Sequence, residues 1–283
     1  MTVREAIAEG SADLAAAGIE TPGLDASLLL AEVLGISRSS LITAAPQPLA
    51  GESSAAYNGL IKRRLAGECA AYILGRKEFY GLDFQVNPSV LVPRPDTETL
   101  VEAAVGELAN YSPPARLIDL CTGCGAVAIA LKHAVPETEV WATDISAEAL
   151  DTAKANAGRL LPPGSIRFFN GDLFDALNNE PSPASIITGN PPYIPSAEIA
   201  ALSPEVRTEP VIALDGGGDG LEIIRRIIAR APDFLCSGGA LLLEADPRQM
   251  ERIAVLLPQA GFTGIQTRKD LSGKPRVITG KFF

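Results

Sequence analysis

Residues 116–144, RLIDLCTGCGAVAIALKHAVPETEVWATD, decide the fold of this chain. An apolar run, RLIDLC, leads into a loop with two glycines, and a helical pattern follows. A second apolar run, EVWATD, then ends in an aspartate. A strand, a crossover helix and a second strand form a βαβ unit, in which the two strands lie parallel. The stretch therefore predicts an α/β fold whose parallel sheet is covered by helices on both faces.

The same alternation continues toward the C-terminus. Strand-like and helix-like patterns follow one another over the next hundred residues, as in other chains built from βαβ units. Gly273-Lys274 separates the last two apolar runs and favours an antiparallel hairpin at the end of the sheet. We expect helices at 147–160, 220–231 and 247–260, and strands at 165–172, 184–190, 240–245, 262–269 and 275–282.

Residues 1–75 show a different pattern. Short helical segments at about 2–17, 24–34 and 53–66 are separated by glycines and prolines and predict a small helical bundle. This bundle is either a stabilising cap or a module that recruits the substrate. The stretch EFYGLDFQVNPSVLV, 78–92, holds two apolar runs divided by Asn87-Pro88, which predicts a β-hairpin within a linker of residues 76–95. The larger domain then covers residues 96–283.

Composition narrows the class of protein. Of the 283 residues, 47% are apolar and 20% charged, as in a globular protein with a sizeable core. The formal net charge of −10 argues against extended nucleic-acid binding, which depends on Lys and Arg neutralising phosphates. There is no apolar run of signal-peptide or membrane-span length, so we expect a cytoplasmic protein without membrane contact. The four cysteines do not resemble a disulfide framework.

The loop Cys121-Thr122-Gly123-Cys124-Gly125 lies between a predicted strand and a predicted helix. Open α/β sheets bind ligands at this place, beyond the carboxyl ends of their strands. Gly123 and Gly125 allow a ligand to approach the backbone, and the helix N-terminus offers N–H groups to a carboxylate. The dinucleotide-binding fingerprint is met only if Ala128 replaces its third glycine, so the loop by itself leaves the cofactor undecided.

Two aspartates follow the next strands. Asp144 is placed to accept hydrogen bonds from both ribose hydroxyls of an adenosine cofactor. Asp172 could accept from an adenine amino group, with Leu173 offering its backbone N–H and an apolar contact. Alternatively, each aspartate caps the following helix or turn. Cys121 and Cys124 would need two further ligands to hold zinc, and the only histidine is His133, so we expect no metal site.

The stretch TGNPPYIPS, 188–196, ends a predicted strand and so reaches the same sheet edge. Pro191 and Pro192 stiffen the loop and leave carbonyl oxygens exposed. The side-chain oxygen of Asn190 and a proline carbonyl provide two acceptors for a planar NH₂ group, on which Tyr193 can stack. This arrangement favours methyl transfer from S-adenosylmethionine to a planar nitrogen, by positioning rather than by a strong base. The alternative is a Pro-Pro turn capped by Asn190.

With these residues the chain resembles the seven-strand S-adenosylmethionine-dependent methyltransferases, and within them the peptide chain release factor glutamine methyltransferases. Adenine-amino DNA methyltransferases share the tetrapeptide 190–193. The more specific similarity lies in AAYILGRKEFYGLDFQV (70–86), VLVPRPDTETLVE (90–102) and RTEPVIALDGGGDGL (207–221). The resemblance covers nearly the whole chain and implies a seven-strand Rossmann-like sheet with a small N-terminal helical bundle and a linking β-hairpin.

The resemblance also implies a reaction. That family methylates the side-chain amide of the glutamine in the Gly-Gly-Gln motif of translation release factors, with S-adenosylmethionine as donor and S-adenosylhomocysteine as product. Asn190, Pro191 and Tyr193 would then be catalytic, and Pro192 would help them bind the substrate. The family's cofactor contacts fall on Cys121, Thr122, Gly123, Cys124, Gly125, Asp144, Asp172, Leu173 and Asn190. Release factors would be the partners of what we expect to be a monomer.

Four points stay open at this stage: the strain at Cys121, the roles of Arg94 and of the glycines 216–218, and a rival function. The family usually has glycine where this chain has Cys121, so a positive φ there would strain the loop. Arg94 could contact the methionine carboxylate or the domain junction, and the glycines 216–218 could be a flexible connection or part of the substrate rim. The rival function is an adenine-amino methyltransferase acting on DNA or RNA, which would need a basic surface, whereas 24 Lys and Arg stand against 34 Asp and Glu.

Overall fold

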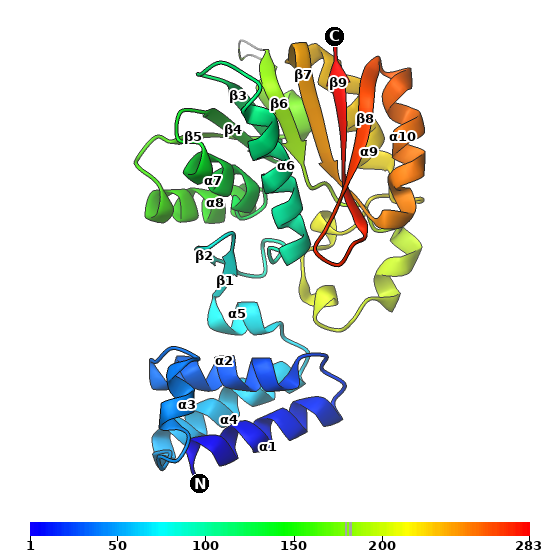
Figure 1. The fold of residues 1–283 in the computed structure, drawn as a ribbon. Helices are drawn as coiled ribbons and strands as arrows, with labels where there is room; N and C mark the ends of the chain where they lie inside the picture. Colours follow the sequence, from blue (N-terminus) through cyan, green and yellow to red (C-terminus); the bar gives the residue numbers. More distant parts are fainter. Residues whose placement is uncertain (179, 181–182) are drawn as a thin grey trace. The chain divides into compact units, whose positions relative to one another are not determined.

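A computed structural model describes residues 1–178, 180 and 183–283. The chain divides into two compact units. The first, which we call the helical unit, comprises Met1–Arg76 together with residues 203–208. The second, which we call the sheet unit, comprises Lys77–Leu202 and Glu209–Phe283 (Figure 1). Within the described ranges, no helix has both the length and the apolar character that a membrane span requires.

The helical unit confirms the expected bundle. A capping box begins its first helix: the Thr2 hydroxyl accepts from the Glu5 N–H at 3.3 Å, and the Glu5 carboxylate accepts from the Thr2 N–H at 2.8 Å. Leucines and Tyr57 fill the space between the helices, with Leu29 and Leu30 fully buried. The helices are α1 (Val3–Ala16), α2 (Pro22–Leu34), α3 (Ser40–Ala44), α4 (Gly51–Leu65) and α5 (Ala70–Leu74).

A buried ion pair lies within the helical unit. Arg64 of α4, only 2% exposed, donates through Nε to the Asp25 carboxylate of α2 at 2.7 Å. Its Nη2 pairs with Glu205, which belongs to the segment 203–208. Removing one member of such a set leaves an uncompensated buried charge, which is strongly destabilising. The pair therefore ties a short segment from the second half of the sequence to helices of the first 76 residues.

The sheet unit contains a seven-stranded sheet with the order β5-β4-β3-β6-β7-β9-β8 (Figure 1). Neighbouring strands from β5 to β7 pair in parallel, and β9 pairs antiparallel with both β7 and β8. The predicted α/β class and C-terminal hairpin are confirmed. The strands are β3 (Arg116–Leu120), β4 (Glu139–Asp144), β5 (Ile166–Asn170), β6 (Ala184–Gly189), β7 (Leu235–Glu244), β8 (Phe262–Lys269) and β9 (Pro275–Phe282).

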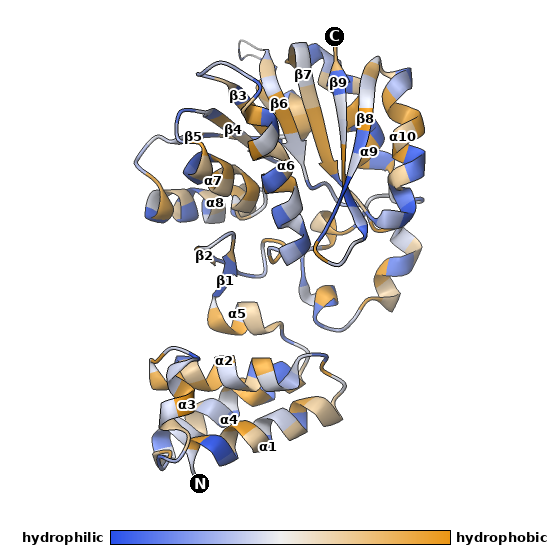
Figure 2. Ribbon diagram, viewed as in Figure 1, coloured by the Kyte–Doolittle hydropathy of each residue, from blue (hydrophilic) through white to orange (hydrophobic). Residues whose placement is uncertain are grey.

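Apolar strands and helices form the core of the sheet unit. In Figure 2 the central strands β6 and β7 are largely hydrophobic, as expected for parallel strands that are covered on both faces. Ile187, Leu241 and Trp141 are among the side chains that are at most 1% exposed. In Figure 1, α6 lies in front of the sheet and α9 behind it. The helices are α6 (Glu98–Leu108), α7 (Ala126–Ala134), α8 (Ala147–Leu160), α9 (Glu222–Arg230) and α10 (Met250–Gln259).

The linking hairpin turns at a different place from the one predicted. Strands β1 (Arg76–Phe79) and β2 (Leu82–Gln85) pair through the two-residue turn Tyr80-Gly81, whereas Asn87-Pro88 follows the second strand. Both turn residues have positive φ, 53° and 73°, as the hairpin turns that match strand twist require. The turn was missed because tyrosine rarely adopts this conformation, and the Asn-Pro pair is the more familiar turn signal.

Candidate active site

A cavity of about 690 Å³ opens at the carboxyl ends of the central strands. The strand register explains which residues meet there. Leu120 of β3 pairs with Thr143 of β4 on one side and with Gly189 of β6 on the other. The residues that follow these positions therefore emerge at one edge, where the strand order reverses, which is the usual ligand site of an open α/β sheet.

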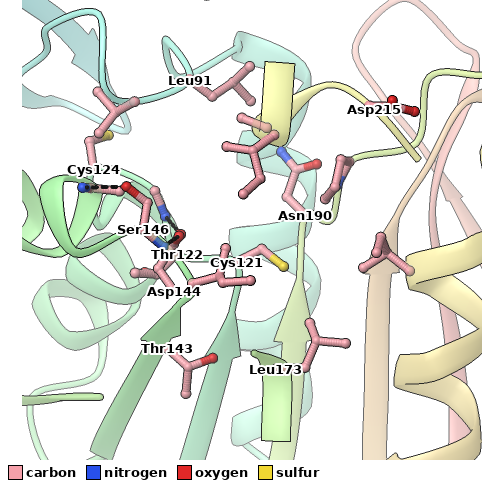
Figure 3. A pocket seen from close by; sticks show the side chains of 18 of the residues that line it. Leu91, Cys121, Thr122, Cys124, Thr143, Asp144, Ser146, Leu173, Asn190 and Asp215 are labelled. Carbon is pink, nitrogen blue, oxygen red and sulfur yellow. Dashed lines mark hydrogen bonds between the residues drawn. The ribbon is translucent and has the colours of Figure 1, made fainter. Parts of the chain in front are cut away.

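The cavity brings together most of the predicted site residues. Figure 3 shows Asn190 projecting from the end of β6 and Asp144 from the end of β4 toward the same space. Of the residues singled out from the sequence, Gly125, Pro191 and Tyr193 do not line the cavity. The predicted residues that do line it are Cys121, Thr122, Gly123, Cys124, Asp144, Asp172, Leu173, Asn190 and Pro192.

Asp144 shapes the loop of residues 121–125. One carboxylate oxygen accepts from the Gly123 N–H at 2.8 Å, and the other accepts from the Ser146 N–H at 2.9 Å. Burial raises the pKa of Asp144, and these backbone hydrogen bonds oppose the rise. Each carboxylate oxygen has a further lone pair, so Asp144 can cap its own turn and still accept from a ligand.

Asp119 is a further residue of the cavity, which the sequence did not identify. It is 1% exposed, and its two oxygens accept from the hydroxyls of Thr122 at 2.7 Å and Thr188 at 2.8 Å. Burial raises the pKa of its carboxyl to about 7. These bonds join the loop after β3 to strand β6. The only available signal was an acid at the last but one position of an apolar strand.

The loop 121–125 contains backbone strain at Cys121. Its φ is +55°, in the left-handed region that costs a residue with a Cβ about 1–2 kcal/mol. Gly123 and Gly125 also have positive φ. A Cβ at Gly125 would lie 2.9 Å from the Ile129 side chain, so glycine is needed there for packing as well. The strain that the sequence left open at Cys121 is therefore present.

Both cysteines of this loop are held as neutral thiols. Burial raises the pKa of Cys121 well above its ordinary value and that of Cys124 to about 12. Reactive or metal-binding cysteines act as thiolates and have lowered pKa values. Among the residues that the structure describes, no three His, Cys, Asp or Glu side chains are grouped so as to hold a metal ion.

Asp172 and Leu173 line the cavity from the loop after β5. The Asp172 carboxylate accepts from Arg226 of α9 at 2.6 Å, a partner that the sequence did not suggest. Leu173 has a φ of +50°. Residues held in sparsely populated backbone conformations gather at functional sites, and two of them, Cys121 and Leu173, face this cavity.

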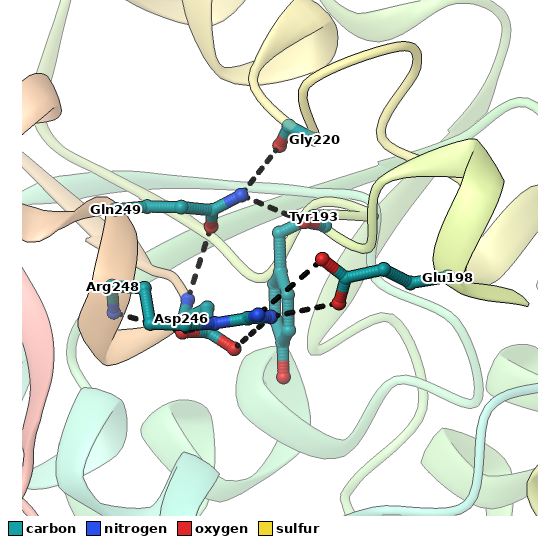
Figure 4. Close-up of polar contacts among 6 residues, drawn as sticks. All are labelled: Tyr193, Glu198, Gly220, Asp246, Arg248 and Gln249. Carbon is teal, nitrogen blue, oxygen red and sulfur yellow. Dashed lines mark hydrogen bonds and ion pairs between the residues drawn. The ribbon is translucent and has the colours of Figure 1, made fainter. Parts of the chain in front are cut away.

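Side chains from distant parts of the sequence hold the tetrapeptide 190–193 in place. Asn190 donates through Nδ2 to the Thr97 hydroxyl at 3.3 Å, while Tyr193 is half-buried against the core. The side chain of Gln249 donates to the backbone oxygens of Tyr193 at 2.8 Å and Gly220 at 3.1 Å (Figure 4). The tetrapeptide is therefore a fixed part of the sheet edge.

The glycine run 216–218 packs against the tetrapeptide. A Cβ on Gly216 would lie 2.8 Å from the Pro192 oxygen and from the Tyr193 Cα, a distance that real Cβ atoms do not reach. The Gly216 N–H also donates to the Ile194 oxygen at 2.9 Å. Gly217 and Gly218 line the cavity. Glycine is thus required at position 216 for packing. From the sequence, the glycines 216–218 could have been either a flexible connection or part of the substrate rim.

Arg94 also lines the cavity, and its guanidinium pairs with the buried carboxylate of Glu209. The same carboxylate accepts from the Val92 N–H at 3.2 Å. Glu209 is 3% exposed, and its charge needs such partners. The pair fixes the segment before α6 to the chain that returns after residue 208.

This sheet order shows a Rossmann-like fold, and the matches to known proteins place the chain among the methyltransferases with this fold. A solved structure, the 16S rRNA N2 G1207 methyltransferase of Thermus thermophilus in complex with AdoMet and guanosine, shares the fold with a TM-score of 0.54 and 19% identity. The match covers 74% of this chain and 50% of that one. Residues 98–207 match the family model of the methyltransferase small domain, and residues 5–75 match that of the PrmC N-terminal domain.

Curated relatives show to which family of methyltransferases the chain belongs. The release factor glutamine methyltransferase of Deinococcus radiodurans is 38% identical over 281 residues, which cover 99% of each chain. The release factor glutamine methyltransferase of Burkholderia pseudomallei is 41% identical over 263 residues, or 91% of each chain. The chain belongs to the release factor glutamine methyltransferase family.

Proposed function

We propose that this chain transfers a methyl group from S-adenosylmethionine to the side-chain amide nitrogen of the glutamine in the Gly-Gly-Gln motif of peptide chain release factors. The observation that carries the proposal is the convergence of a glycine-containing loop, Asp144 and Asn190 on one cavity. The chain's similarity to its relatives over nearly their whole length supports the choice of substrate.

The cavity offers groups that suit the methyl donor. Its volume of about 690 Å³ lies within the range of pockets for molecules of this size. Gly123 leaves space beside the backbone, and the free lone pairs of Asp144 can accept from ribose hydroxyls. Cys121, Thr122, Cys124 and Gly125 would complete the loop around the amino acid part, and Leu173 would contact the adenine. When bound, the donor supplies an electrophilic methyl group.

Asp172 differs from the other proposed cofactor contacts because its side chain already forms an ion pair within the protein. Its carboxylate is shared with Arg226, so an adenine amino group would compete with, or join, an existing ion pair. The carboxylate has lone pairs enough for both partners. We infer that Arg226 holds Asp172 in position for the adenine.

The tetrapeptide would hold the substrate amide. The Nδ2 of Asn190 is engaged by Thr97, so its Oδ1 is the atom left to accept a substrate N–H. A proline carbonyl of residues 191–192 would accept the second N–H, and Tyr193 would support the loop from behind. An amide nitrogen is a weak nucleophile, and fixing both N–H bonds favours the pyramidal form that presents its lone pair. A new N–C bond then forms as the S–C bond breaks, and the amide proton leaves to water.

We also propose that the helical bundle of residues 1–75, which forms most of the helical unit, recruits the release factor, while residues 96–283 carry out methyl transfer. The match of residues 5–75 to the PrmC N-terminal domain supports a role shared across the family. Deleting the unit would test this only if the remainder folds. A surface variant of α1 that lowers the affinity for the release factor, but leaves the affinity for S-adenosylmethionine unchanged, is the appropriate check.

The proposed function is tested by incubating the protein with methyl-labelled S-adenosylmethionine and three acceptors. These are a bacterial release factor, the same factor with its Gly-Gly-Gln glutamine replaced, and adenine-containing DNA. We expect label only on the intact factor, located on that glutamine by mass spectrometry. Label on the DNA would favour the adenine-amino methyltransferase, and label on the substituted factor would place the reaction at another residue.

A further inference from the structure

Gln249, the last residue of the short helix η7 (Pro247–Gln249), is a buried amide that bonds the tetrapeptide. It is 5% exposed and does not line the cavity itself. Its Nε2 atom donates to the Tyr193 oxygen at 2.8 Å and to the Gly220 oxygen at 3.1 Å. Its Oε1 atom accepts from the Asp246 N–H at 3.2 Å (Figure 4). One side chain therefore joins three separate segments of the sheet unit.

The orientation of this amide is determined by its partners. The NH₂ group of a glutamine has two N–H donors, and its oxygen can only accept. All three partners are backbone groups, so which of them donates and which accepts cannot change. The reverse orientation would set donor against donor at Asp246 and acceptor against acceptor at Tyr193 and Gly220. The Gln249 amide therefore directs both of its N–H groups to backbone oxygens.

A helix cap explains only part of this arrangement. Gln249 and Asp246 form a capping box at the start of η7, in which the glutamine contributes only its oxygen. A glutamate serves equally well in a capping box. The two N–H groups, which a glutamate side chain lacks, bond Tyr193 and Gly220. Glutamine rather than glutamate is therefore required by these two segments and not by the helix.

Gly220 leaves the space that this contact needs. A Cβ on Gly220 would lie 2.5 Å from the Gln249 Nε2 atom and closer still to the Tyr193 oxygen, distances that real Cβ atoms do not reach. Its φ of +73° also favours glycine. The backbone of Gly220 therefore lies directly against that of Tyr193, and Gln249 bonds the two together.

The tetrapeptide is held at both ends by side chains from outside it. Asn190 bonds Thr97 at the first position, and Tyr193 bonds Gln249 at the last. The two prolines between them have fixed φ angles, which leaves the backbone little freedom to absorb a displacement. A shift of the Tyr193 oxygen should therefore move Asn190 and the proline carbonyls as well.

We propose that Gln249 is a positioning residue for methyl transfer. By holding the Tyr193 oxygen, it keeps Asn190 and a proline carbonyl at the spacing that the two N–H groups of the substrate amide require. Displacements of about an ångström can cost about 10²-fold in rate. Because Gln249 lies outside the cavity, it acts through the tetrapeptide. This inference rests on the proposed function, in which the tetrapeptide holds the substrate amide.

The kinetic test compares two variants of similar size. Gln249→Glu keeps the shape and the cap but sets an oxygen against the oxygens of Tyr193 and Gly220, whereas Gln249→Met only removes the hydrogen bonds. We expect kcat to fall about 10²-fold in Gln249→Glu and about tenfold in Gln249→Met. The dissociation constant for S-adenosylmethionine, measured by calorimetry, should stay within about twofold of the wild-type value in both variants, which also shows that they are folded.

The order of the two losses separates the proposed role from a merely structural one. If Gln249 served only to fill space and cap η7, Gln249→Glu would be harmless and Gln249→Met would be the worse variant. A Gln249→Glu variant with the kcat of the wild type would therefore overturn the proposal.

Arg248 provides a matched control in the same turn. Its guanidinium bonds the Glu198 carboxylate at 3.0 and 3.3 Å, so it also contacts the segment that follows the tetrapeptide (Figure 4). The two side chains are 64% and 46% exposed, and exposed ion pairs contribute little. Arg248→Met should therefore change kcat by less than about twofold. A loss as large as that in Gln249→Met would contradict a special role for the buried amide.

A double variant tests whether Gln249 acts through the tetrapeptide. Asn190→Ala removes the acceptor that the tetrapeptide presents to the substrate in the proposed function. Adding Gln249→Met to this variant should lower kcat further by at most about threefold, because the group that Gln249 positions is already absent. Losses that multiply in full would mean that Gln249 affects another step, and the proposal would fail.

A second measurement does not depend on activity. In protein labelled with 3-fluorotyrosine, the ¹⁹F signal of Tyr193 is identified by its loss in Tyr193→Phe. Gln249→Glu and Gln249→Met should shift this signal, and Arg248→Met should leave it unchanged. If the wild type methylates no release factor but the signal moves in the Gln249 variants, the proposed function fails and the hold of Gln249 on the tetrapeptide stands. If methylation occurs and neither kcat nor the signal responds to these variants, the inference fails alone.

Discussion

Two loops meet at the same edge of the sheet, and they are fixed in different ways. Residues 121–125 are held by acids close to them, since Asp119 and Asp144 accept from Thr122 and Gly123 at separations of 3 and 21 residues. The tetrapeptide 190–193 is held by residues far away in sequence. Asn190 bonds Thr97, 93 residues earlier, and Tyr193 bonds Gln249, 56 residues later.

The two loops differ in what determines their backbone conformation: local hydrogen bonds do so in residues 121–125, and packing does so in residues 190–193. The loop 121–125 tolerates a residue with positive φ, because strong local hydrogen bonds impose the conformation. The tetrapeptide has its conformation set by prolines and by close contact with Gly216. We therefore expect changes at 121–125 to affect cofactor affinity and stability, and changes around 190–193 to affect turnover.

The largest effect should come from Asn190→Ala. In the proposed function Asn190 accepts a hydrogen bond from the substrate amide, and loss of that acceptor should lower kcat about 10³-fold, as for other positioned groups in active sites. The affinity for S-adenosylmethionine, measured by calorimetry, should change by no more than a few fold. A variant with near wild-type kcat would show that Asn190 takes no part in the reaction. It would also contradict the expectation that changes in the tetrapeptide affect turnover.

Gly216→Ala should act on turnover without touching any substrate. The new methyl group would push the tetrapeptide by up to an ångström, and displacements of that size can cost about 10²-fold in rate. Gly218→Ala is a matched control, because its Cβ would meet only Glu222 Oε1 at 3.8 Å. Equal kcat values for the two variants would show that the tetrapeptide does not depend on this contact.

Asp144→Asn should affect the other loop. Both carboxylate oxygens accept from backbone N–H groups, so the amide's NH₂ must face one of them in either orientation. We expect the dissociation constant for S-adenosylmethionine to rise about tenfold or more, with kcat at saturation nearly unchanged. Asp151→Asn, an exposed position on α8, controls for the loss of one negative charge. A fall in kcat alone would contradict the division between the loops.

Cys121→Gly should give the smallest effect, a gain. Relief of left-handed strain is worth about 1–2 kcal/mol, and the added freedom of glycine in the unfolded chain takes back about 0.4–1 kcal/mol. The free energy of unfolding in urea should rise by about 0.5 kcal/mol. Cys121→Ala keeps a Cβ at φ +55° and should show no such gain. Equal stabilisation by both variants would mean that the thiol, rather than the backbone, is unfavourable.

The same contrast explains what could be predicted from the sequence. The order of strands and helices, and the loop 121–125, follow from local patterns of apolar residues and glycines, because each is determined within about 30 residues, the length of a βαβ unit. Asp119 and Arg226 escaped notice because nothing in their local sequence indicates which side chain they meet. Thr97 escaped notice for the same reason, since a threonine after an Arg-Pro-Asp run gives no sign of a partner 93 residues away.

The hairpin shows a different limit. Tyr80 was read as part of an apolar run because its chemistry suits a strand, yet its backbone turns with φ +53°. Such a conformation is available to tyrosine only when the flanking strands impose it. The sequence predicted that a hairpin exists but not where it turns.

Residues 203–208 belong to the helical unit, and this limits how segments of two related proteins can be joined into one chimeric chain. The chain leaves the sheet unit after Leu202 and returns to it at Glu209, so a single cut at Arg76–Lys77 does not separate the two units. A chimera made by joining one relative's first 76 residues to another's remainder would match Arg64 and Asp25 with a foreign counterpart of Glu205. The chimeras that fold should therefore be those in which the N-terminal helices and the six residues 203–208, more than a hundred positions downstream, come from the same relative.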